Sequence, residues 1–249
     1  AHAALDTGYG QVHVPFVGEG APAYDAPYPE QMLHPPGTLT FDAMDALAVG
    51  CGMGRGANAI ASLQKALGCN APLLLDADAL NLIASDTSLA GVLTAGAVKG
   101  ASGADGTARP CVLTPHPLEA ARLLGTDSRS IQRDRLGSAR ALAARFAAVV
   151  VLKGAGTVIA SPDGRAAVNP TGNAALATGG TGDVLGGIIG ALLAERLPGY
   201  EAALAGVYLH GLAAETLTAG GSGPAGLTAG ELAPTVRTLL NRLIYPGRD

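Results

Sequence analysis

Four short apolar runs, each closed by a glycine or a polar residue, constrain the fold of this chain more than any other feature. Helical patterns lie between them, among them residues 60–67 and a set at 3.6-residue spacing from Leu136 to Phe146. Strands buried on both faces read as unbroken Val/Leu runs, and helical crossovers between such strands imply a parallel sheet. The sequence therefore predicts an α/β fold with a mostly parallel central sheet. The four expected strands are residues 46–50, 72–76, 110–114 and 148–153.

Two further strands and a last helix are expected later in the chain. Residues 157–160 and 165–168 should pair as a hairpin, because the Ser-Pro-Asp-Gly sequence between them is strong turn chemistry. Thr228 and Glu231 have the spacing of a capping box and open an expected helix that runs to about Leu243. The chain has 249 residues and no interdomain linker, so we expect one domain.

The composition excludes several classes of protein. Hydrophobic residues make up 48% of the chain and charged residues 14%, so a large core can form. A formal net charge of −4 argues against nucleic acid or an anionic membrane as a partner. Cys51, Cys69 and Cys111 are too few and too widely spaced for a disulfide framework or a zinc site, which favours a reducing compartment. No stretch resembles a signal peptide, and the longest apolar run, residues 184–194, is well short of the roughly 20 residues of a spanning helix, so we expect a cytoplasmic protein.

Residues 169–193 are the segment most informative about function. A turn-forming run leads into Gly179-Gly180-Thr181-Gly182-Asp183, and an apolar helix is expected to start at Val184. Glycines let the backbone approach a ligand closely, and the unpaired N–H groups of a helix's first turn form a cradle for an anion. The charge of Asp183 would oppose a phosphate held there, which points to a chemical role: taking a proton from a hydroxyl that attacks the phosphate. The alternative is an ordinary helix start, where aspartate is favoured for electrostatic reasons alone.

Several polar residues are expected on one rim of the sheet, because ligands of open α/β sheets bind beyond the carboxyl ends of the strands. Asp76 and Asp78 follow the second expected strand, His116 the third, and Lys153 the fourth. Each also has a structural reading. Asp76 and Asp78 can cap the helix that begins near Leu80, Lys153 can be an exposed lysine at a strand end, and His116 can be part of a rigid loop.

A second glycine cluster competes for a nucleotide. Gly52, Gly54 and Ala57 fit the G-x-G-x-x-A variant of the dinucleotide fingerprint, and Asp76 ends the next strand about 20 residues later. A Rossmann-type NAD-dependent dehydrogenase is therefore an alternative interpretation, although short glycine patterns arise easily and nothing resembles a separate catalytic domain. No P-loop occurs in the sequence.

Six segments carry a more specific signal: VGCGMGR (49–55), PLLLDADALNLIA (72–84), VLTPHPLEAARLLG (112–125), VVVLKGAGTVIASPDG (149–164), NPTGNAALATGGTGDVLGGIIGALLA (169–194) and GVYLHGLAAE (206–215). In this order they resemble the ADP/ATP-dependent NAD(P)H-hydrate dehydratases, a branch of the ribokinase-like superfamily. The resemblance covers residues 10–243, and the combination of TPHPLE, LKGAGT and ATGGTGDVL is specific to that branch. It implies a ribokinase-like three-layer α/β/α sandwich.

The resemblance also implies a reaction, the repair of damaged nicotinamide cofactors. The substrate would be the S form of NADH or NADPH hydrate, in which water has added across the 5,6 double bond of the ring. A nucleotide, ADP in preference to ATP, would phosphorylate the ring hydroxyl, and elimination of phosphate would restore the double bond. Mg²⁺ would accompany the phosphates, held largely by phosphate and water oxygens, so no residue is assigned as a metal ligand.

Individual residues receive roles from the same resemblance. Asp183 would be the catalytic base. The implied substrate-binding residues are Gly52, Gly54, His116 and Asp183. The implied nucleotide-binding residues are Lys153, Gly154, Ala155, Gly156, Thr157, Thr181 and Gly182. The last two would offer backbone N–H groups to the transferred phosphoryl group.

Some features depart from the family pattern. Cys51 stands where the family has proline, and Ala174-Ala175 stand where it has Pro-Gly; neither change removes a group that the reaction uses. The family's first strand and part of its first helix have no counterpart here, so we expect the single domain of residues 1–249 to lack them. We also expect a homo-oligomer, with a tetramer favoured, and a fused or separate NAD(P)H-hydrate epimerase. A ribokinase-like small-molecule kinase for a vitamin precursor or sugar and a catalytically inactive binding module stay as alternatives.

Overall fold

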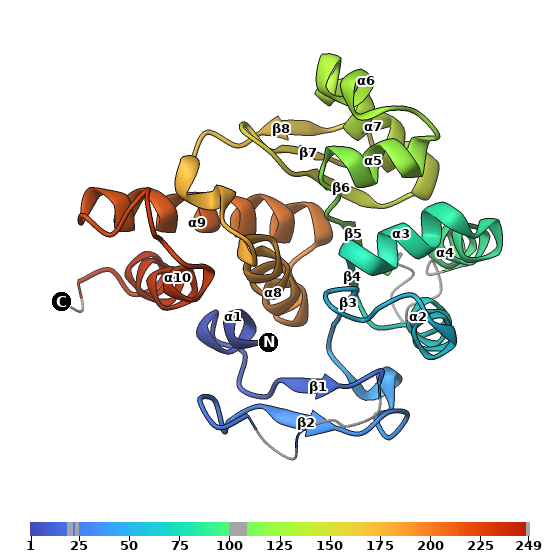
Figure 1. Cartoon of the computed structure of the whole chain (residues 1–249), viewed down its shortest axis with the longest axis horizontal. Helices are drawn as coiled ribbons and strands as arrows, with labels where there is room; N and C mark the ends of the chain where they lie inside the picture. The colour runs from blue at the N-terminus through green and yellow to red at the C-terminus, as the bar shows by residue number, and fades with distance from the viewer. Residues whose placement is uncertain (19–21, 23–24, 100–108, 248–249) are drawn as a thin grey trace.

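A six-stranded sheet forms the middle layer of the molecule (Figure 1). The computed structural model describes residues 1–18, 22, 25–99 and 109–247. The strands lie side by side in chain order, with β3 to β6 parallel and β7 and β8 antiparallel, which confirms the predicted parallel sheet and hairpin. These strands are β3 (Leu47–Val49), β4 (Leu73–Leu75), β5 (Cys111–Leu113), β6 (Val149–Leu152), β7 (Val158–Ala160) and β8 (Ala166–Val168).

The central strands β4, β5 and β6 are buried on both faces. Every one of their residues is buried, and successive side chains of a strand point to opposite faces of the sheet. Leu73 and Leu75 therefore pack in one apolar cluster, while Leu74 packs in the other. The unbroken Val/Leu runs of the sequence reflect these two cores.

Helices cover both faces of the sheet and complete the three expected layers (Figure 1). The helices on one face are α2 (Ala57–Gly68), α3 (Ala77–Ser85), α4 (Thr87–Lys99), α5 (Pro117–Leu124), α6 (Ser128–Arg133) and α7 (Arg135–Phe146). Those on the other face are α1 (His2–Asp6), α8 (Thr181–Ala194), α9 (Gly199–Ala219) and α10 (Ala229–Ile244). Two short 3-10 helices, η1 (Phe41–Ala43) and η3 (Ala174–Ala177), lie in connections.

A small second sheet stands beside the main one. Its strands β1 (His13–Pro15) and β2 (Met32–His34) pair in parallel. A cavity of about 480 Å³ lies between β1, β3 and α8; Phe16, Ala48 and Gly190 contribute to its wall, and Asp183 reaches it as well. The sequence did not predict these strands, because neither carries an unbroken Val/Leu run.

Helix α8 starts earlier than predicted. It begins at Thr181 and not at Val184, so Asp183 lies inside the first turn. Gly180 precedes it with a φ of +88°, a conformation that favours glycine. The Thr181 hydroxyl donates to the carbonyl oxygen of Leu176 at 2.8 Å and so ties the helix start to the preceding loop.

The last helix has the predicted capping box. The backbone N–H of Thr228 donates to Glu231 Oε2 at 2.7 Å, at the start of α10. Among the residues that the structure describes, no helix has the length and hydropathy needed to cross a membrane.

Candidate active site

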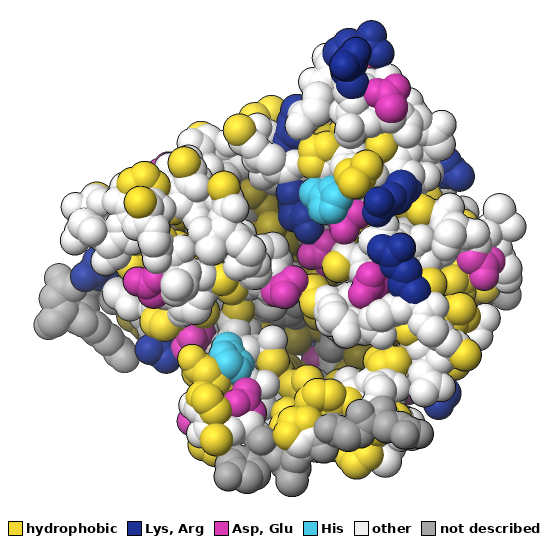
Figure 2. Space-filling view, in the orientation of Figure 1, with side chains coloured by type: hydrophobic (Ala, Val, Ile, Leu, Met, Phe, Trp, Pro, Cys, Tyr) yellow, Lys and Arg dark blue, Asp and Glu magenta, His cyan; other side chains and the backbone are white. Residues whose placement is uncertain are grey.

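The structure brings the predicted rim residues together beyond the carboxyl ends of β3 to β6. Helix α8 packs on the other face of the sheet, and its first turn lies next to the turns that follow these strands. Figure 2 shows acidic, basic and histidine side chains gathered in the middle of one face of the molecule.

The turn after β3 touches the turn after β4. Gly50 has a φ of +132°, and a Cβ atom at this position would lie 1.8 Å from the backbone oxygen of Asp76. Only glycine fits such an approach. The contact places the next residue, Cys51, beside Asp76.

Asp76 is a buried carboxylate with two partners. Its Oδ1 accepts a hydrogen bond from the backbone N–H of Ala77 at 2.8 Å and another from Nζ of Lys153 at 2.7 Å. Asp76 is therefore both the N-cap of α3 and the counter-ion of Lys153. The capping reading is confirmed for Asp76, and its role in the active site stays a prediction. A buried ion pair of this kind is costly to break, because the remaining charge loses its compensation.

The Lys153 ammonium lies beside the first turn of α8. A Cβ atom on Gly182 would be 3.5 Å from Lys153 Nζ. The backbone N–H groups of Gly182 and Asp183 find no acceptor in the described part of the chain. The positive end of the helix and the ammonium both favour an anion in the space between them, so the geometry supports the predicted phosphate cradle.

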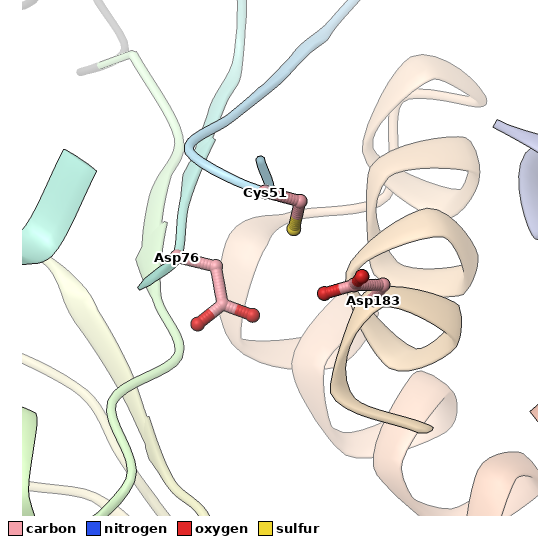
Figure 3. Close-up of side chains that lie close together, drawn as sticks. All are labelled: Cys51, Asp76 and Asp183. Atoms are coloured by element: carbon pink, nitrogen blue, oxygen red, sulfur yellow. The ribbon is translucent and has the colours of Figure 1, made fainter. Parts of the chain in front are cut away.

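Cys51, Asp76 and Asp183 point into one shared space (Figure 3). One ligand-type atom of each lies within 4.8 Å of the other two. Burial of the thiol, together with the negative charges of Asp76 and Asp183, raises the pKa of Cys51 to about 12. Cys51 is therefore an uncharged thiol at neutral pH, although the residue lies at the exposed edge of the site.

These three side chains are a poor match for Mg²⁺. Mg²⁺ prefers oxygen ligands in octahedral geometry, whereas Cys51 offers a protonated sulfur and Asp76 Oδ1 is already bound to Lys153. Asp183 and the second oxygen of Asp76, Oδ2, are the remaining oxygen donors of the group. A magnesium ion that enters with a nucleotide would thus be held mainly by phosphate and water.

His116 caps helix α5 with its own ring. Its Nδ1 accepts from the backbone N–H groups of Leu118 and Glu119, and its Nε2 lies 3.3 Å from Glu119 Oε1. Burial and the charge of Lys153 lower the pKa of His116, so the ring is neutral. Because both ring nitrogens are engaged, His116 offers a ligand the face of its ring. Glu119, whose pKa burial raises, was not singled out by the sequence.

The loop after β3 carries Gly52 and Gly54. Both have positive φ, and no atom lies within 4 Å of the position where a side chain would start, so this backbone is open to a ligand. Asp78 holds the loop, accepting from the N–H of Gly54 at 3.0 Å and from Arg55 Nε at 3.3 Å.

The loop after β6 carries the residues for which the family resemblance implies nucleotide binding. Gly154 and Gly156 have φ of +143° and +60°, and the Thr157 hydroxyl donates to the carbonyl oxygen of Gly154 at 3.0 Å. Ala155 lies exposed between the glycines. Arg135 braces this loop from behind, a role with no signal in the sequence, because an arginine at a helix start reads as surface charge.

A buried histidine lies close to the phosphate cradle. His210, on α9, is 6% exposed, and its Nε2 has no hydrogen-bond partner in the described residues. Burial lowers the pKa of His210 to about 4; the Thr181 backbone offsets part of this effect and the charge of Lys153 adds to it.

Comparison with known proteins decides the family. The family model described as NAD(P)H-hydrate dehydratase matches residues 1–235. The chain belongs to this family. It is 44% identical to an ADP-dependent (S)-NAD(P)H-hydrate dehydratase of Neisseria meningitidis over 98% of this chain and 79% of that protein. It is also 39% identical to a bifunctional NAD(P)H-hydrate repair enzyme of Escherichia coli, over 96% of this chain but only 44% of that longer protein.

Solved structures of similar proteins agree with the fold. An ADP/ATP-dependent NAD(P)H-hydrate dehydratase of Bacillus subtilis, co-crystallised with ATP and Mg²⁺ and soaked with CoA, superimposes with a TM-score of 0.76 at 30% identity. The match covers 97% of this chain and 84% of that one. A ribokinase-like protein of Enterococcus faecalis also reaches a TM-score of 0.76, at 25% identity over 97% of this chain and 80% of its own. The ribokinase-like α/β/α sandwich is therefore confirmed.

The alternative interpretations lose their support. The strands β3 to β8 follow chain order without the reversal that creates the dinucleotide crevice of a Rossmann dehydrogenase. The glycine cluster of residues 50–56 instead meets the turn after β4. The similarity over nearly the whole chain is to NAD(P)H-hydrate dehydratases, and these relatives favour the dehydratase reading over a small-molecule kinase or an inactive binding module.

Proposed function

We propose that residues 1–249 act as a nucleotide-dependent (S)-NAD(P)H-hydrate dehydratase, a lyase that returns the hydrated cofactor to NADH or NADPH. The observation that carries this proposal is the pairing of Asp183 with an anion cradle made by Lys153 Nζ and the N–H groups at the start of α8. A base beside a phosphate site is what phosphoryl transfer to a hydroxyl requires. The similarity to the Neisseria enzyme supplies the substrate.

Within this proposal, each part of the reaction has a group that performs it. The terminal phosphates of the nucleotide lie against Gly182 and Lys153. Asp183 takes the proton of the ring hydroxyl, the freed oxygen attacks the terminal phosphorus, and the bond from that phosphorus to the rest of the nucleotide breaks. The carbon–oxygen bond of the ring then breaks as phosphate leaves, the neighbouring carbon loses a proton to solvent, and the 5,6 double bond is restored. The N–H groups and the ammonium stabilise charge on the transferred phosphoryl group.

The two ligands approach from opposite sides of this centre. The nucleotide lies along residues 153–157, with Thr181 and Gly182 at its phosphates. The hydrated nicotinamide lies along Gly52, Gly54 and the ring face of His116. Mg²⁺ enters with the nucleotide, bound by phosphate and water oxygens. ADP is the preferred donor, in line with the Neisseria relative, and ATP serves as a second one.

The wider setting follows from the same assignment. We propose that the enzyme works in the cytoplasm, in line with the few, widely spaced cysteines, and that it forms a homo-oligomer, with a tetramer favoured. The bifunctional E. coli relative supports an epimerase, fused or separate, that supplies the S form.

Asp183→Asn tests the proposal. The amide keeps the shape of the carboxylate but is not a base, so turnover of hydrated NADH should fall by roughly 10²–10⁴. Affinity for the nucleotide should survive, because a charge that opposes phosphate is removed. The assay supplies hydrated NADH, Mg²⁺ and ADP or ATP, and follows the absorbance of reduced nicotinamide. Near-normal turnover by Asp183→Asn would contradict the assigned base, and an inactive wild type with both donors would contradict the function.

A further inference from the structure

One guanidinium group holds the shape of the loop after β6. Arg135 is the first residue of α7, and its Nη2 donates to the carbonyl oxygens of Leu152 at 3.0 Å and Gly156 at 3.4 Å. Both of its terminal nitrogens also reach the carbonyl oxygen of Lys153 at 3.5 Å. Burial lowers the pKa of Arg135, but an arginine keeps its charge over the whole physiological range. The loop is thus built around a half-buried cation.

The bonds to Arg135 fix the direction of the loop's N–H groups. In a trans peptide the C=O of one residue and the N–H of the next point in opposite directions. Since the carbonyls of Lys153 and Gly156 face Arg135, the N–H groups of Gly154 and Thr157 face away from it. Neither N–H has an acceptor in the described residues.

The side that faces away from Arg135 is the side of the site. The N–H of Lys153, which opposes the carbonyl of Leu152, donates to the backbone oxygen of Pro115 at 2.9 Å. Pro115 belongs to the turn that carries His116 on the site's rim. The positive φ of Gly154 and Gly156 allows the backbone to turn in this way.

We propose that Arg135 is a positioning residue, which aims the N–H groups of Gly154 and Thr157 at the bound nucleotide without touching it. This inference rests on the proposed function, in which residues 153–157 bind the nucleotide. The guanidinium also polarises the peptide groups whose carbonyls it binds, and this strengthens their N–H groups as donors to phosphate or ribose oxygens. Nucleotide affinity then depends on a residue outside the contact surface.

The test compares Arg135→Met and Arg135→Lys with the wild type and with Arg133→Met. Arg133 lies on the neighbouring helix and bonds only the exposed hydroxyl of Ser130 at 3.0 Å among the described contacts, so it is a matched control. Calorimetric titration gives the Kd for ADP and, as a probe of the substrate pocket, for NADPH. Steady-state assays give kcat and KM, and thermal unfolding gives Tm.

We expect Arg135→Met to weaken ADP binding by about tenfold or more, because the N–H groups of Gly154 and Thr157 are no longer held in the direction of the nucleotide. The Kd for NADPH and kcat at saturating ADP should stay close to wild type, which a general loss of structure would not allow. The ADP affinity of Arg135→Lys should lie between those of the wild type and Arg135→Met, because an ammonium group reaches fewer carbonyls than a guanidinium group. Arg133→Met should match the wild type.

Three outcomes would overturn the inference. One is wild-type ADP affinity in Arg135→Met; another is a parallel loss of ADP affinity, NADPH affinity and Tm. If Arg135→Met does not fold, Arg135→Lys decides, and the third outcome is wild-type ADP affinity in this variant despite faster hydrogen exchange at residues 153–157. A wild type that binds neither ADP nor ATP contradicts the proposed function itself, so the two failures are distinguishable.

Discussion

At the scale of single residues, Asp76 combines a structural and a site role. Its carboxylate caps α3 and holds the ammonium of Lys153 in front of α8. A helix cap can be supplied by an amide or a hydroxyl, but a lysine partner needs a charge. The ion pair therefore explains why this cap is an aspartate.

Asp76→Asn should separate these roles. The amide oxygen still caps α3, but Lys153 loses its counter-ion. We expect a loss of roughly 1–3 kcal/mol in the free energy of unfolding and a higher KM for the nucleotide, because Lys153 is no longer held beside Gly182. Urea unfolding and steady-state kinetics measure both. Asp127→Asn, the same exchange at the exposed cap of α6, is the control; equal effects in the two variants would refute the role of the ion pair.

His210 should make stability depend on pH. Its pKa is about 4 in the folded state against an ordinary value of 6.5, so between these values the unfolded chain binds more protons and stability falls as the pH falls. From pH 7 to pH 5 the loss should be about 2 kcal/mol, an order-of-magnitude figure. Urea unfolding of the wild type and of His210→Asn at both pH values measures the contribution of His210 to this pH dependence. The carboxylates titrate alike in the two proteins, so their effect cancels in the comparison. Equal pH dependence would show that His210 does not contribute.

At the scale of elements, α8 is both the start of the site and a packing helix. Its N-terminus carries Thr181, Gly182 and Asp183, and its apolar residues pack on the sheet and on α9. A glycine of α8 and a glycine of α9 differ in how much room their surroundings leave for a side chain. A Cβ atom at Gly190 would lie 3.5 Å from Ala48 Cβ, whereas one at Gly206 would lie 2.5 Å from Ile189 Cγ1.

Alanine at these two glycines should therefore have opposite effects. Gly190→Ala makes an ordinary contact and gains helix propensity, so the free energy of unfolding should rise by about 0.5–1 kcal/mol. Gly206→Ala overpacks the α8–α9 contact and should lose about 1–3 kcal/mol. Urea unfolding decides, with activity measured alongside. A loss of stability in Gly190→Ala would mean that the space between α8 and Ala48 of β3 is too small for a methyl group.

The sequence predicted the elements whose burial is uniform along the chain. Strands β4 to β6 were predicted because residues buried on both faces leave unbroken apolar runs. Strand β3, in which only Leu47 is buried, was predicted from its short apolar run, and β7 and β8 from the turn between them. It placed the start of α8 too late, since Thr181 and Gly182 have no helical pattern of their own. Motif resemblance marked Asp183 and Lys153, and their roles stay predictions. Arg135 gave no signal, because its contacts to residues 152–156 form only when the loop after β6 folds against α7. Glu119 was missed although its capping contact with His116 is local in the sequence.

At the scale of the whole molecule, the small sheet is the part least tied to the rest. Strands β1 and β2 have no fully buried residue, and the cavity of about 480 Å³ separates them from β3. The central strands are buried throughout. Local stability follows buried apolar contact, so it should differ sharply between the two sheets.

Hydrogen exchange should show this difference directly. Amides of residues 13–15 and 32–34 should exchange by local opening, well before those of β4 to β6, which should exchange only on global unfolding. Exchange measured by mass spectrometry at several denaturant concentrations separates the two modes. A common rate of exchange for both sheets would show that they unfold as one unit.

The chain-order arrangement of the main sheet has a consequence for how the protein is made. Each strand after β3 pairs with the one synthesised just before it, so the sheet can grow at one edge while the chain leaves the ribosome. Helices α2 to α7 cover the first face during this growth, but α8, α9 and α10 come last. The second face, with Leu74, Val112 and Val151, thus stays uncovered until the final third of the chain emerges. Nascent chains stopped before α8 should be strong targets for chaperones that recognise apolar surface.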